Sequence, residues 1–420
     1  MNTPSIDSCA PDAPARAARV VGAAPPRAGK VLMVSAVPPF PTSAGNRARI
    51  RTLAEAIERL GHELHFAALV RPGSGVDPQM SRHFGRRLHV LPFERRRGPA
   101  WALEHAARRV RQRLNLDSGW LWTLDAWYDD RIDARLRELQ SREAFDTVVI
   151  EYVYLSRAAH VFPPGVRTVI DSHDRFTLRH RIARDAGQPY GWFSLSEADE
   201  RRGLARADAV IAMQGEEAAF FSALLAGTTT RVETVGHVFE PAAPVPRSHD
   251  RRALLVGSDN PINAEGARYF VEQVLPQVRR DLPDFELLVA GDVGRALPDA
   301  PGIRKLGRVA AIGEAYAQAA VALNPVRSGT GLCIKSLETL AFGLPLVTTR
   351  CGARGLEAWA GEAFAMVADD DPAAMAAAVC TLLRRPEEGD AMGRRARAAA
   401  LEIDRVQKAA LRRVLGEEAR

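Results

Sequence analysis

The sequence predicts an α/β protein made of two doubly wound domains, and three observations support this class. Short apolar runs bounded by turn residues alternate with amphipathic helical stretches over most of the chain, as in parallel sheets covered by helices. This alternation stops at residues 236–250, which are rich in proline and lack periodicity, and then starts again. The length of 420 residues also exceeds the size that one hydrophobic core usually reaches.

The first half of the chain begins with a strand–helix–strand unit. The run Lys30–Ser35 (KVLMVS) predicts a buried parallel strand, and a loop rich in Pro, Ser and Gly leads from it to an amphipathic helix at 47–60. Gly61 ends that helix, and residues 62–70 predict the second strand. Further strands are expected at 82–90, 146–152, 167–171, 207–213 and 231–235, with a helix near 194–206.

The second half repeats the pattern. Strands are expected at 253–257, 285–290, 303–306, 321–324, 346–349 and 364–367, and helices at 265–281, 312–319 and 334–342. In doubly wound folds, ligands bind at the carboxyl ends of the strands. We therefore expect the binding site in a cleft between the two domains.

This pattern predicts a division of the chain into four parts. Residues 1–28 predict a disordered tail, because they carry Pro, Asp and Arg without a continuous apolar run. Residues 29–240 predict the N-terminal domain and residues 251–395 the C-terminal domain. Residues 396–420 predict a helix that packs back on the N-terminal domain.

Composition places the protein among soluble globular proteins, with 46% apolar and 26% charged residues. No apolar run approaches the ~20 residues that span a bilayer. Four cysteines without a CxxC pair or metal-ligand spacing favour a reducing compartment, so we expect a cytoplasmic protein without a metal or other cofactor.

Arginine supplies most of the positive charge, and the net charge is +6. This positive charge either lies on a solvated surface or attracts anions such as sugar nucleotides and lipid phosphates. The arginine-rich helix expected at 94–114 leaves two alternatives open: packing on its own domain, or docking to anionic lipid headgroups. We expect no nucleic-acid partner.

The most informative segment is 324–343, NPVRSGTGLCIKSLETLAFG. A strand ends at Asn324, and a glycine loop leads into a helix, where small residues and free N–H groups favour phosphate binding. Arg327 and Lys335 add positive charge on either side of the loop, and the guanidinium is suited to clamping a diphosphate. Glu338 lies inside the helix and can accept hydrogen bonds from vicinal hydroxyls such as those of ribose.

This segment resembles the donor site of family 4 retaining glycosyltransferases (glycosyl transferases group 1). These enzymes have the GT-B fold, two Rossmann-like doubly wound domains facing across a cleft. Their motif reads G-x-G-L-x-x-K-x-x-E-A-x-A-x-G-x-P-V-V, and this chain has GTGLCIKSLETLAFGLPLV from Gly329. The GARGL run at 352–356 is also similar to the family, and the resemblance spans roughly residues 30–395.

The resemblance implies a set of donor-binding residues. Glu338 matches the second glutamate of the E-x7-E motif, which holds the ribose, whereas Thr330 stands at the first glutamate, as in a branch with the loop R-x-G-T-G. Thr330 and loop amides are then expected to contact the donor. The family's Arg and Lys after the first donor-domain strand are missing here, so Arg327 and Lys335 are expected to meet the diphosphate charge. The implied donor contacts are Gly257, Ser258, Val309, Gly329, Thr330, Gly331, Leu332 and Glu338.

The N-terminal half contains weaker matches. Gly45 lies in a loop that resembles the family's glycine loop, which approaches the donor phosphates. Arg47 and Arg49 follow it; cations are disfavoured at a helix start, so they either solvate it or meet an anionic ligand. His173, in the run DSHD at the end of a strand, resembles the family's histidine and is expected to contact the transferred sugar or the acceptor, unless it is structural. Glu151 ends a neighbouring strand and is a further candidate for an acceptor contact.

The resemblance implies transfer of a hexose-type sugar from a UDP- or GDP-linked donor to an acceptor hydroxyl, with retention of configuration. We assign His173, Arg327 and Lys335 to the catalytic group, with stabilisation of the leaving diphosphate as the main catalytic effect. The acceptor is expected to be a saccharide or a lipid-linked saccharide of bacterial surface polysaccharide or glycolipid assembly, reached at the inner face of the membrane. Two alternatives remain: a nucleotide-sugar epimerase and a catalytically silent binding scaffold of the same fold.

Overall fold

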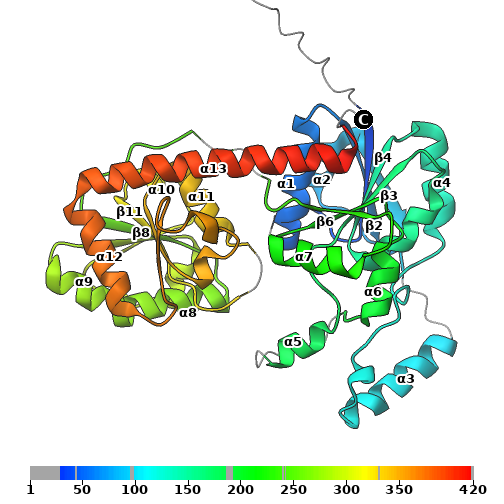
Figure 1. Ribbon diagram of the computed structural model, residues 1–420, viewed down its shortest axis with the longest axis horizontal. Helices are drawn as coiled ribbons and strands as arrows, with labels where there is room; N and C mark the ends of the chain where they lie inside the picture. Colours follow the sequence, from blue (N-terminus) through cyan, green and yellow to red (C-terminus); the bar gives the residue numbers. More distant parts are fainter. Residues whose placement is uncertain are drawn as a thin grey trace, which may run out of the picture.

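The computed structural model describes residues 29–42, 45–94, 99–185, 193–238, 241, 243–329 and 332–417. It confirms the expected fold class, because each half of the chain forms one parallel sheet covered by helices (Figure 1). The tail expected at 1–28 lies outside the described residues.

The N-terminal sheet has seven strands in the order β3-β2-β1-β4-β5-β6-β7. Its central strands are buried along nearly their whole length, which explains why they read as continuous apolar runs. The strands are β1 Lys30–Ser35, β2 Glu63–Val70, β3 Leu88–Pro92, β4 Thr147–Glu151, β5 Arg167–Asp171, β6 Ala209–Ala212 and β7 Arg231–Thr234. The helices are α1 Gly45–Arg59, α2 Pro78–Phe84, α3 Pro99–Arg113, α4 Ile132–Glu143, α5 Arg179–Asp185, α6 Glu197–Leu204 and α7 Gly215–Leu224.

The C-terminal sheet has six strands in the order β10-β9-β8-β11-β12-β13. A π turn at Phe270–Val274 interrupts the helix expected at 265–281 and divides it into α8 and α9. The strands are β8 Arg252–Val256, β9 Glu286–Ala290, β10 Ile303–Gly307, β11 Val321–Asn324, β12 Leu346–Thr349 and β13 Ala365–Val367. The helices are α8 Pro261–Tyr269, α9 Leu275–Asp281, α10 Ile312–Ala317, α11 Ile334–Phe342 and α12 Pro372–Arg384.

The strand order reverses between β1 and β4 in the first sheet and between β8 and β11 in the second. The crevice at the carboxyl ends of the strands beside such a reversal is where doubly wound folds bind ligands. The loops after β4, β5, β8 and β11 are therefore the part of each domain where a site is expected.

A single long helix, α13 (Pro386–Leu415), connects the two domains (Figure 1). Its first half packs Ala396, Ala399 and Ala400 into the C-terminal core beside α11. Its second half places four apolar residues in the N-terminal core with β1 and α1, namely Ala410, Leu411, Val414 and Leu415. The helix begins earlier than the expected residue 396, because Pro386 stands in its first turn, where proline needs no hydrogen-bond partner.

The strand expected at 82–90 is wrong in its first part. Asp77 caps a helix there, since its side chain accepts a hydrogen bond of 2.8 Å from the Gln79 amide, and Pro78 begins α2. Met80 and Phe84 lie one turn apart on the buried side of that helix. A helix as short as α2 holds too few apolar residues to show a helical period, so its sequence resembles that of a strand.

Within the described ranges, no helix combines the length and the apolar character that a membrane crossing requires.

Candidate functional site

The loop between β11 and α11 carries the donor motif. Asn324, the last residue of β11, donates from its side-chain amide to the Ser336 hydroxyl at 2.8 Å and to the Gly352 carbonyl at 3.4 Å. It thereby ties the strand end, the start of α11 and the loop after β12 together. Gly329 has φ of 130°, a backbone conformation that side chains rarely adopt, so glycine is required there. The predicted contacts Thr330 and Gly331 lie outside the described residues.

Arg354 holds this loop from the other side. Its guanidinium donates to the Gly329 carbonyl and, at 2.7 Å, to the Cys351 sulfur. The Arg354 carbonyl also accepts from the Cys333 amide at 3.2 Å. Arg354 was not among the predicted site residues, although it lies in the GARGL run that carries part of the resemblance. The structure gives it the role of fixing the glycine loop.

Arg327 lies at the same end of the sheet but already has a carboxylate partner. Its Nε donates to the Glu265 carboxylate at 2.9 Å, and its guanidinium lies 4.5 Å from the Tyr269 ring centre. Both partners come from α8, which crosses directly over this segment. A Cβ at Gly266 would lie 2.8 Å from the Pro325 carbonyl oxygen, so only glycine permits this approach. The pairing with Glu265 was not predicted, because no spacing rule connects residues in different elements.

Lys335, in the first turn of α11, contacts the first turn of α8. Its ammonium donates to the Asn263 side-chain oxygen, and Asn263 donates to the Ser258 carbonyl and hydroxyl at 3.0 and 3.1 Å. Burial lowers the pKa of Lys335. Gly257 is closed to a ligand at its amide, which donates to the Ala290 carbonyl at 3.0 Å. The predicted contact Ser258 is connected to Lys335 through Asn263.

Glu338 lies one turn beyond Lys335 on α11, partly buried. The Tyr316 hydroxyl donates to its carboxylate at 3.3 Å. Burial raises the pKa of Glu338, while the Tyr316 hydrogen bond and the charge of Lys335 act in the opposite direction. Leu332 and Val309, two further predicted donor contacts, are half-buried: Leu332 packs against the core that α11 shares with α13, and Val309 against the core beside α10.

A cavity of about 560 Å³ opens beside this region, at the carboxyl ends of β9 and β10. Two of its lining residues, Leu306 and Gly307, lie just before the predicted donor contact Val309. Its full lining is Gly291, Asp292, Gly294, Arg295, Lys305, Leu306, Gly307 and Arg308.

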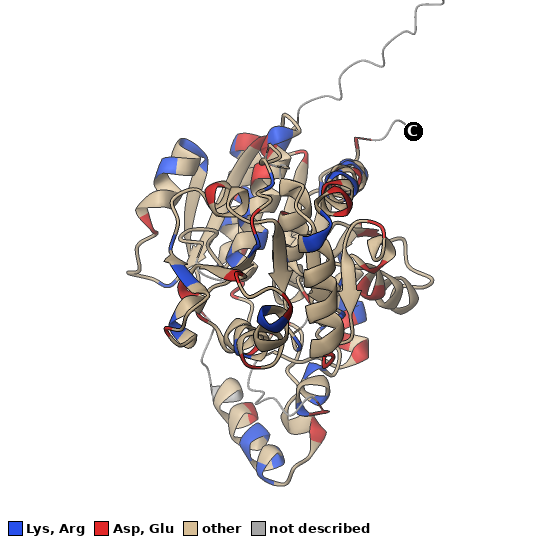
Figure 2. Ribbon diagram, turned by 90° about the vertical axis from the view of Figure 1, so that its left-hand side faces the viewer, with Lys and Arg blue, Asp and Glu red and all other residues tan. Residues whose placement is uncertain are grey.

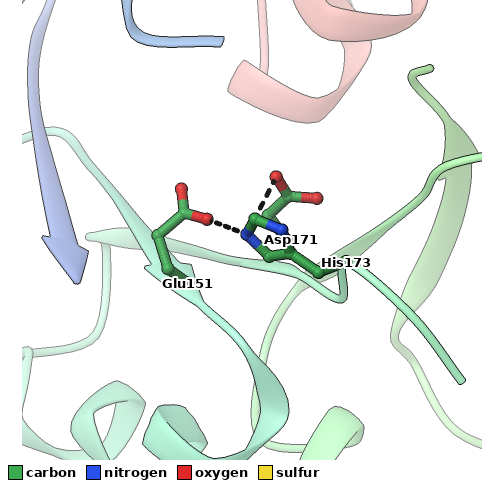
Figure 3. Close-up of side chains that lie close together, drawn as sticks. All are labelled: Glu151, Asp171 and His173. Atoms are coloured by element: carbon green, nitrogen blue, oxygen red, sulfur yellow. Dashed lines mark hydrogen bonds and ion pairs between the residues drawn. The ribbon is translucent and has the colours of Figure 1, made fainter. Parts of the chain in front are cut away.

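The N-terminal half-site gathers three side chains from the ends of β4 and β5 (Figure 3). His173 Nε2 is hydrogen-bonded to the Glu151 carboxylate and lies 3.7 Å from an Asp171 oxygen. Both carboxylates are fully buried. Burial and the neighbouring Asp171 raise the pKa of Glu151, and the hydrogen bond from His173 opposes this effect.

Arg49 compensates the charge of Asp171. Its Nε donates to one Asp171 oxygen at 3.0 Å, a terminal nitrogen donates to the other at 3.3 Å, and the second terminal nitrogen donates to the Gly236 carbonyl. Only 2% of Arg49 is exposed. Neither sequence-based alternative for this residue is correct, because it is neither a solvated cation nor one that faces a ligand. It is a buried structural partner of β5.

The backbone around His173 is strained. His173 has φ of 61° and Tyr152 has φ of 71°, values that non-glycine residues adopt at a cost of order 1–3 kcal/mol each. The two rings stack, with centres 3.9 Å apart and an 11° angle between their planes. The Tyr152 hydroxyl accepts from the Asn46 side chain at 3.1 Å, beside the predicted contact Gly45 at the start of α1. A Cβ at Gly45 would meet no atom within 4 Å, so packing in this structure does not demand glycine there.

Glu151, Asp171 and His173 have suitable atoms within 4.8 Å of one another for a metal ion. However, both oxygens of Asp171 are engaged by Arg49, and one Glu151 oxygen is engaged by His173. Metal binding would have to displace these partners. The arrangement fits a buried cluster of ion pairs and hydrogen bonds better than a metal centre.

Glu217, on α7, is a further titratable group at this sheet edge. Its carboxylate accepts from the Met213 amide at 3.0 Å, and burial, Asp174 and Asp171 raise its pKa to about 7. The raised value means that stability is lost as pH rises from about 4.5 to about 7, because the unfolded chain ionises first. We expect this group to lower the free energy of unfolding by about 2–3 kcal/mol over that window.

Glu217→Gln is expected to remove that loss, since the amide oxygen can still accept from Met213. Urea unfolding at pH 5 and pH 8 measures it. The variant should gain stability relative to the parent at pH 8 and little at pH 5. Glu216→Gln, at the exposed neighbouring position, serves as the control. Equal pH dependence in the Glu217 variant and the parent would contradict the assignment.

Two family profiles match the chain. The one described as "Glycosyl transferases group 1" covers residues 250–385, and the one described as "Glycosyl transferase 4-like domain" covers residues 44–237. Together with the two-sheet architecture, they place the protein among the GT-B glycosyltransferases. The chain belongs to group 1 of these enzymes, as the sequence motif predicted. No curated protein matches it in sequence.

Several solved structures share the fold at low sequence identity. Sucrose-phosphate synthase from Thermosynechococcus elongatus is 14% identical, with a TM-score of 0.60 over 92% of this chain and 97% of that one. HepE of Anabaena, in complex with UDP and glucose, is 12% identical, with a TM-score of 0.53 over 90% and 97%. A mutant of TarM from S. aureus, in complex with fondaparinux, α-GlcNAc-glycerol and UDP, is 9% identical, with a TM-score of 0.61 over 92% and 99%.

Proposed function

We propose that the protein transfers a hexose-type sugar from a nucleoside diphosphate sugar to an acceptor hydroxyl, with retention of configuration. The observation that carries this proposal is the set of donor-type groups at the end of β11. In this set Arg354 contacts Gly329, and Glu265 and Asn263 of α8 contact Arg327 and Lys335. Glu338 follows Lys335 on α11. The complexes of similar structures with UDP support a UDP-linked donor.

In this proposal the donor half-site binds the nucleotide and stabilises the leaving group. Glu338 accepts hydrogen bonds from the ribose hydroxyls. Arg327 and Lys335 offset the charge that develops on the departing diphosphate, and they do so in a partly desolvated setting where electrostatic effects are strong. Because protein cations supply this charge, we propose that the reaction needs no divalent metal.

The N-terminal half-site orients the sugar and the acceptor. His173 is held by Glu151 through Nε2 and by the stacked Tyr152 ring, so the orientation of its ring is fixed before substrate binds. We propose that its other ring nitrogen contacts a hydroxyl of the transferred sugar or the acceptor. The acceptor oxygen then bonds to the anomeric carbon while the leaving phosphate takes the acceptor's proton. No carboxylate of the protein attacks the sugar.

The proposed acceptor is a saccharide or lipid-linked saccharide of bacterial surface polysaccharide or glycolipid assembly, reached at the inner face of the membrane. Saccharide ligands in the similar TarM structure support the acceptor class.

The enzyme, treated with EDTA, should be incubated with a panel of UDP, GDP, TDP and ADP sugars and saccharide acceptors. The product's anomeric configuration is then read by NMR. We expect transfer with the donor's configuration kept. An inverted product would reject retention, loss of activity that added Mg²⁺ restores would reject metal independence, and donor conversion without an acceptor would favour an epimerase.

A further inference from the structure

Two polar side chains of helix α3, Arg108 and Gln112, attach it to its domain. Arg108 is buried, with its guanidinium 3.5 Å from the Trp122 ring centre, and its Nε donates to the Gly119 carbonyl at 2.9 Å. Gln112, one turn further along, donates to the same carbonyl at 2.9 Å. A Cβ at Gly119 would lie 2.6 Å from the backbone nitrogen of Gln112, so the helix and this residue are in close contact. These contacts hold the side of α3 that carries Arg108 and Gln112 against its domain.

The opposite face of α3 is apolar and exposed. Leu103, Val110 and Leu114 are 74%, 54% and 65% exposed. Their spacing of seven and then four residues places them in one stripe along the helix. Leu116, just beyond the helix, is 48% exposed and extends the patch. This arrangement is the reverse of an ordinary surface helix, which turns its apolar stripe toward its own core.

The charges around this stripe are mainly positive. Arg109 and Arg113 are exposed on α3, and Glu104 is its only acidic residue. Asp117, which follows the helix, is paired with Arg181 and Arg184 of α5. Figures 1 and 2 show α3 projecting from the N-terminal domain with basic positions along it. Ile182, between the two arginines on α5, is also 46% exposed.

We propose that the outward face of α3 docks on an anionic lipid bilayer. Leu103, Val110 and Leu114 enter the boundary between headgroups and acyl chains, while Arg109 and Arg113 meet lipid phosphates. An apolar face flanked by arginines is the form that interfacial helices take. A protein partner is disfavoured, because the stripe is a narrow aliphatic ridge without the aromatic anchors that dominate protein interfaces.

Docking on a bilayer would give the enzyme access to a lipid-linked acceptor, and this part of the inference rests on the proposed function. The binding itself follows from α3 alone. The two proposals therefore fail separately: vesicle binding can be measured without any sugar transfer, and sugar transfer can be measured with a water-soluble acceptor.

The test uses the full chain and sedimentation with vesicles. The vesicles contain equal parts phosphatidylglycerol and phosphatidylcholine, and a second set contains phosphatidylcholine alone. We expect the protein to sediment with the anionic vesicles and not with the neutral ones. Leu103→Ser with Leu114→Ser should weaken binding at least about tenfold, and Arg109→Gln with Arg113→Gln should do the same.

The matched control is Leu401→Ser with Val406→Ser, two exposed apolar residues of α13 that are 47% and 45% exposed. This variant should bind vesicles like the parent. All variants should keep the parent's thermal midpoint and its activity on a soluble acceptor. Failure of the parent to sediment, or undiminished binding by the Leu103 and Leu114 variant, would overturn the proposal. Concentration-dependent self-association that this variant abolishes, without vesicle binding, would assign the face to a second copy.

Discussion

Arg327→Ala is expected to weaken donor binding about 10²-fold and to lower kcat/KM by about 10³-fold, because it removes a guanidinium from the developing diphosphate charge. The loss in kcat/KM should exceed the loss in binding by about tenfold, and this excess should appear in kcat, since that charge is largest in the transition state. Calorimetry with a UDP-sugar and steady-state kinetics measure the two effects. Arg280→Ala, at a 73% exposed arginine of α9, is the control and should change neither.

The Glu265 partner makes this prediction more specific. In the structure, Arg327 is paired with Glu265, so a donor diphosphate must share or replace that carboxylate. Glu265→Gln keeps the size of the side chain and removes its charge. We expect it to leave donor binding unchanged or stronger while Arg327→Ala weakens it. If donor binding survives both Arg327→Ala and Glu338→Ala, the donor site assigned here is wrong.

His173→Ala is expected to lower kcat about 10²–10³-fold with a smaller change in KM, because a hydrogen-bonding group held in position contributes mainly in the transition state. Glu151→Gln should reproduce part of this loss, about tenfold or more, because a neutral amide holds the His173 ring less strongly than a carboxylate does. The affinity for the donor nucleotide should remain near the parent's in both variants.

His160→Ala is the matched control, since His160 is an exposed histidine of the same domain and should leave kcat unchanged. Glu151 is buried, so each variant's thermal midpoint and circular dichroism must be compared with the parent's. The histidine ring signals in NMR provide a readout that misfolding would not mimic, because Glu151→Gln should shift His173 alone. A folded His173→Ala enzyme with the parent's kcat would reject the assignment.

Most of the architecture could be predicted from local pattern. The strand Val321–Asn324 and the helix Ile334–Phe342 occur at the predicted bounds, because a buried strand and an amphipathic helix each leave a distinct periodicity. Residues 82–90 could not be assigned correctly, since capping by Asp77 overrides a short apolar run. The start of α13 was also missed, because its first two turns continue directly from the residues after α12.

The site was predictable only as far as motifs reach. The glycine loop, Arg327 and Glu338 lie in one continuous segment that the family resemblance covers. Their partners Glu265 and Tyr316 come from other elements, and no spacing in the sequence connects them. The burial of Arg49 against Asp171 is likewise a tertiary fact, because a cation at a helix start gives no local sign of a partner 122 residues away.

The helix α13 has a consequence for how the protein is made. Ala410, Leu411, Val414 and Leu415 belong to the N-terminal core, yet they follow the whole C-terminal domain in the chain. Domains usually fold in order of synthesis, N-terminal first. Here the N-terminal domain cannot close its core until the C-terminal domain has been synthesised. Until then, the apolar surface of β1 and α1 that α13 covers stays exposed. A chain truncated after α12 would keep this surface exposed and would be prone to aggregation.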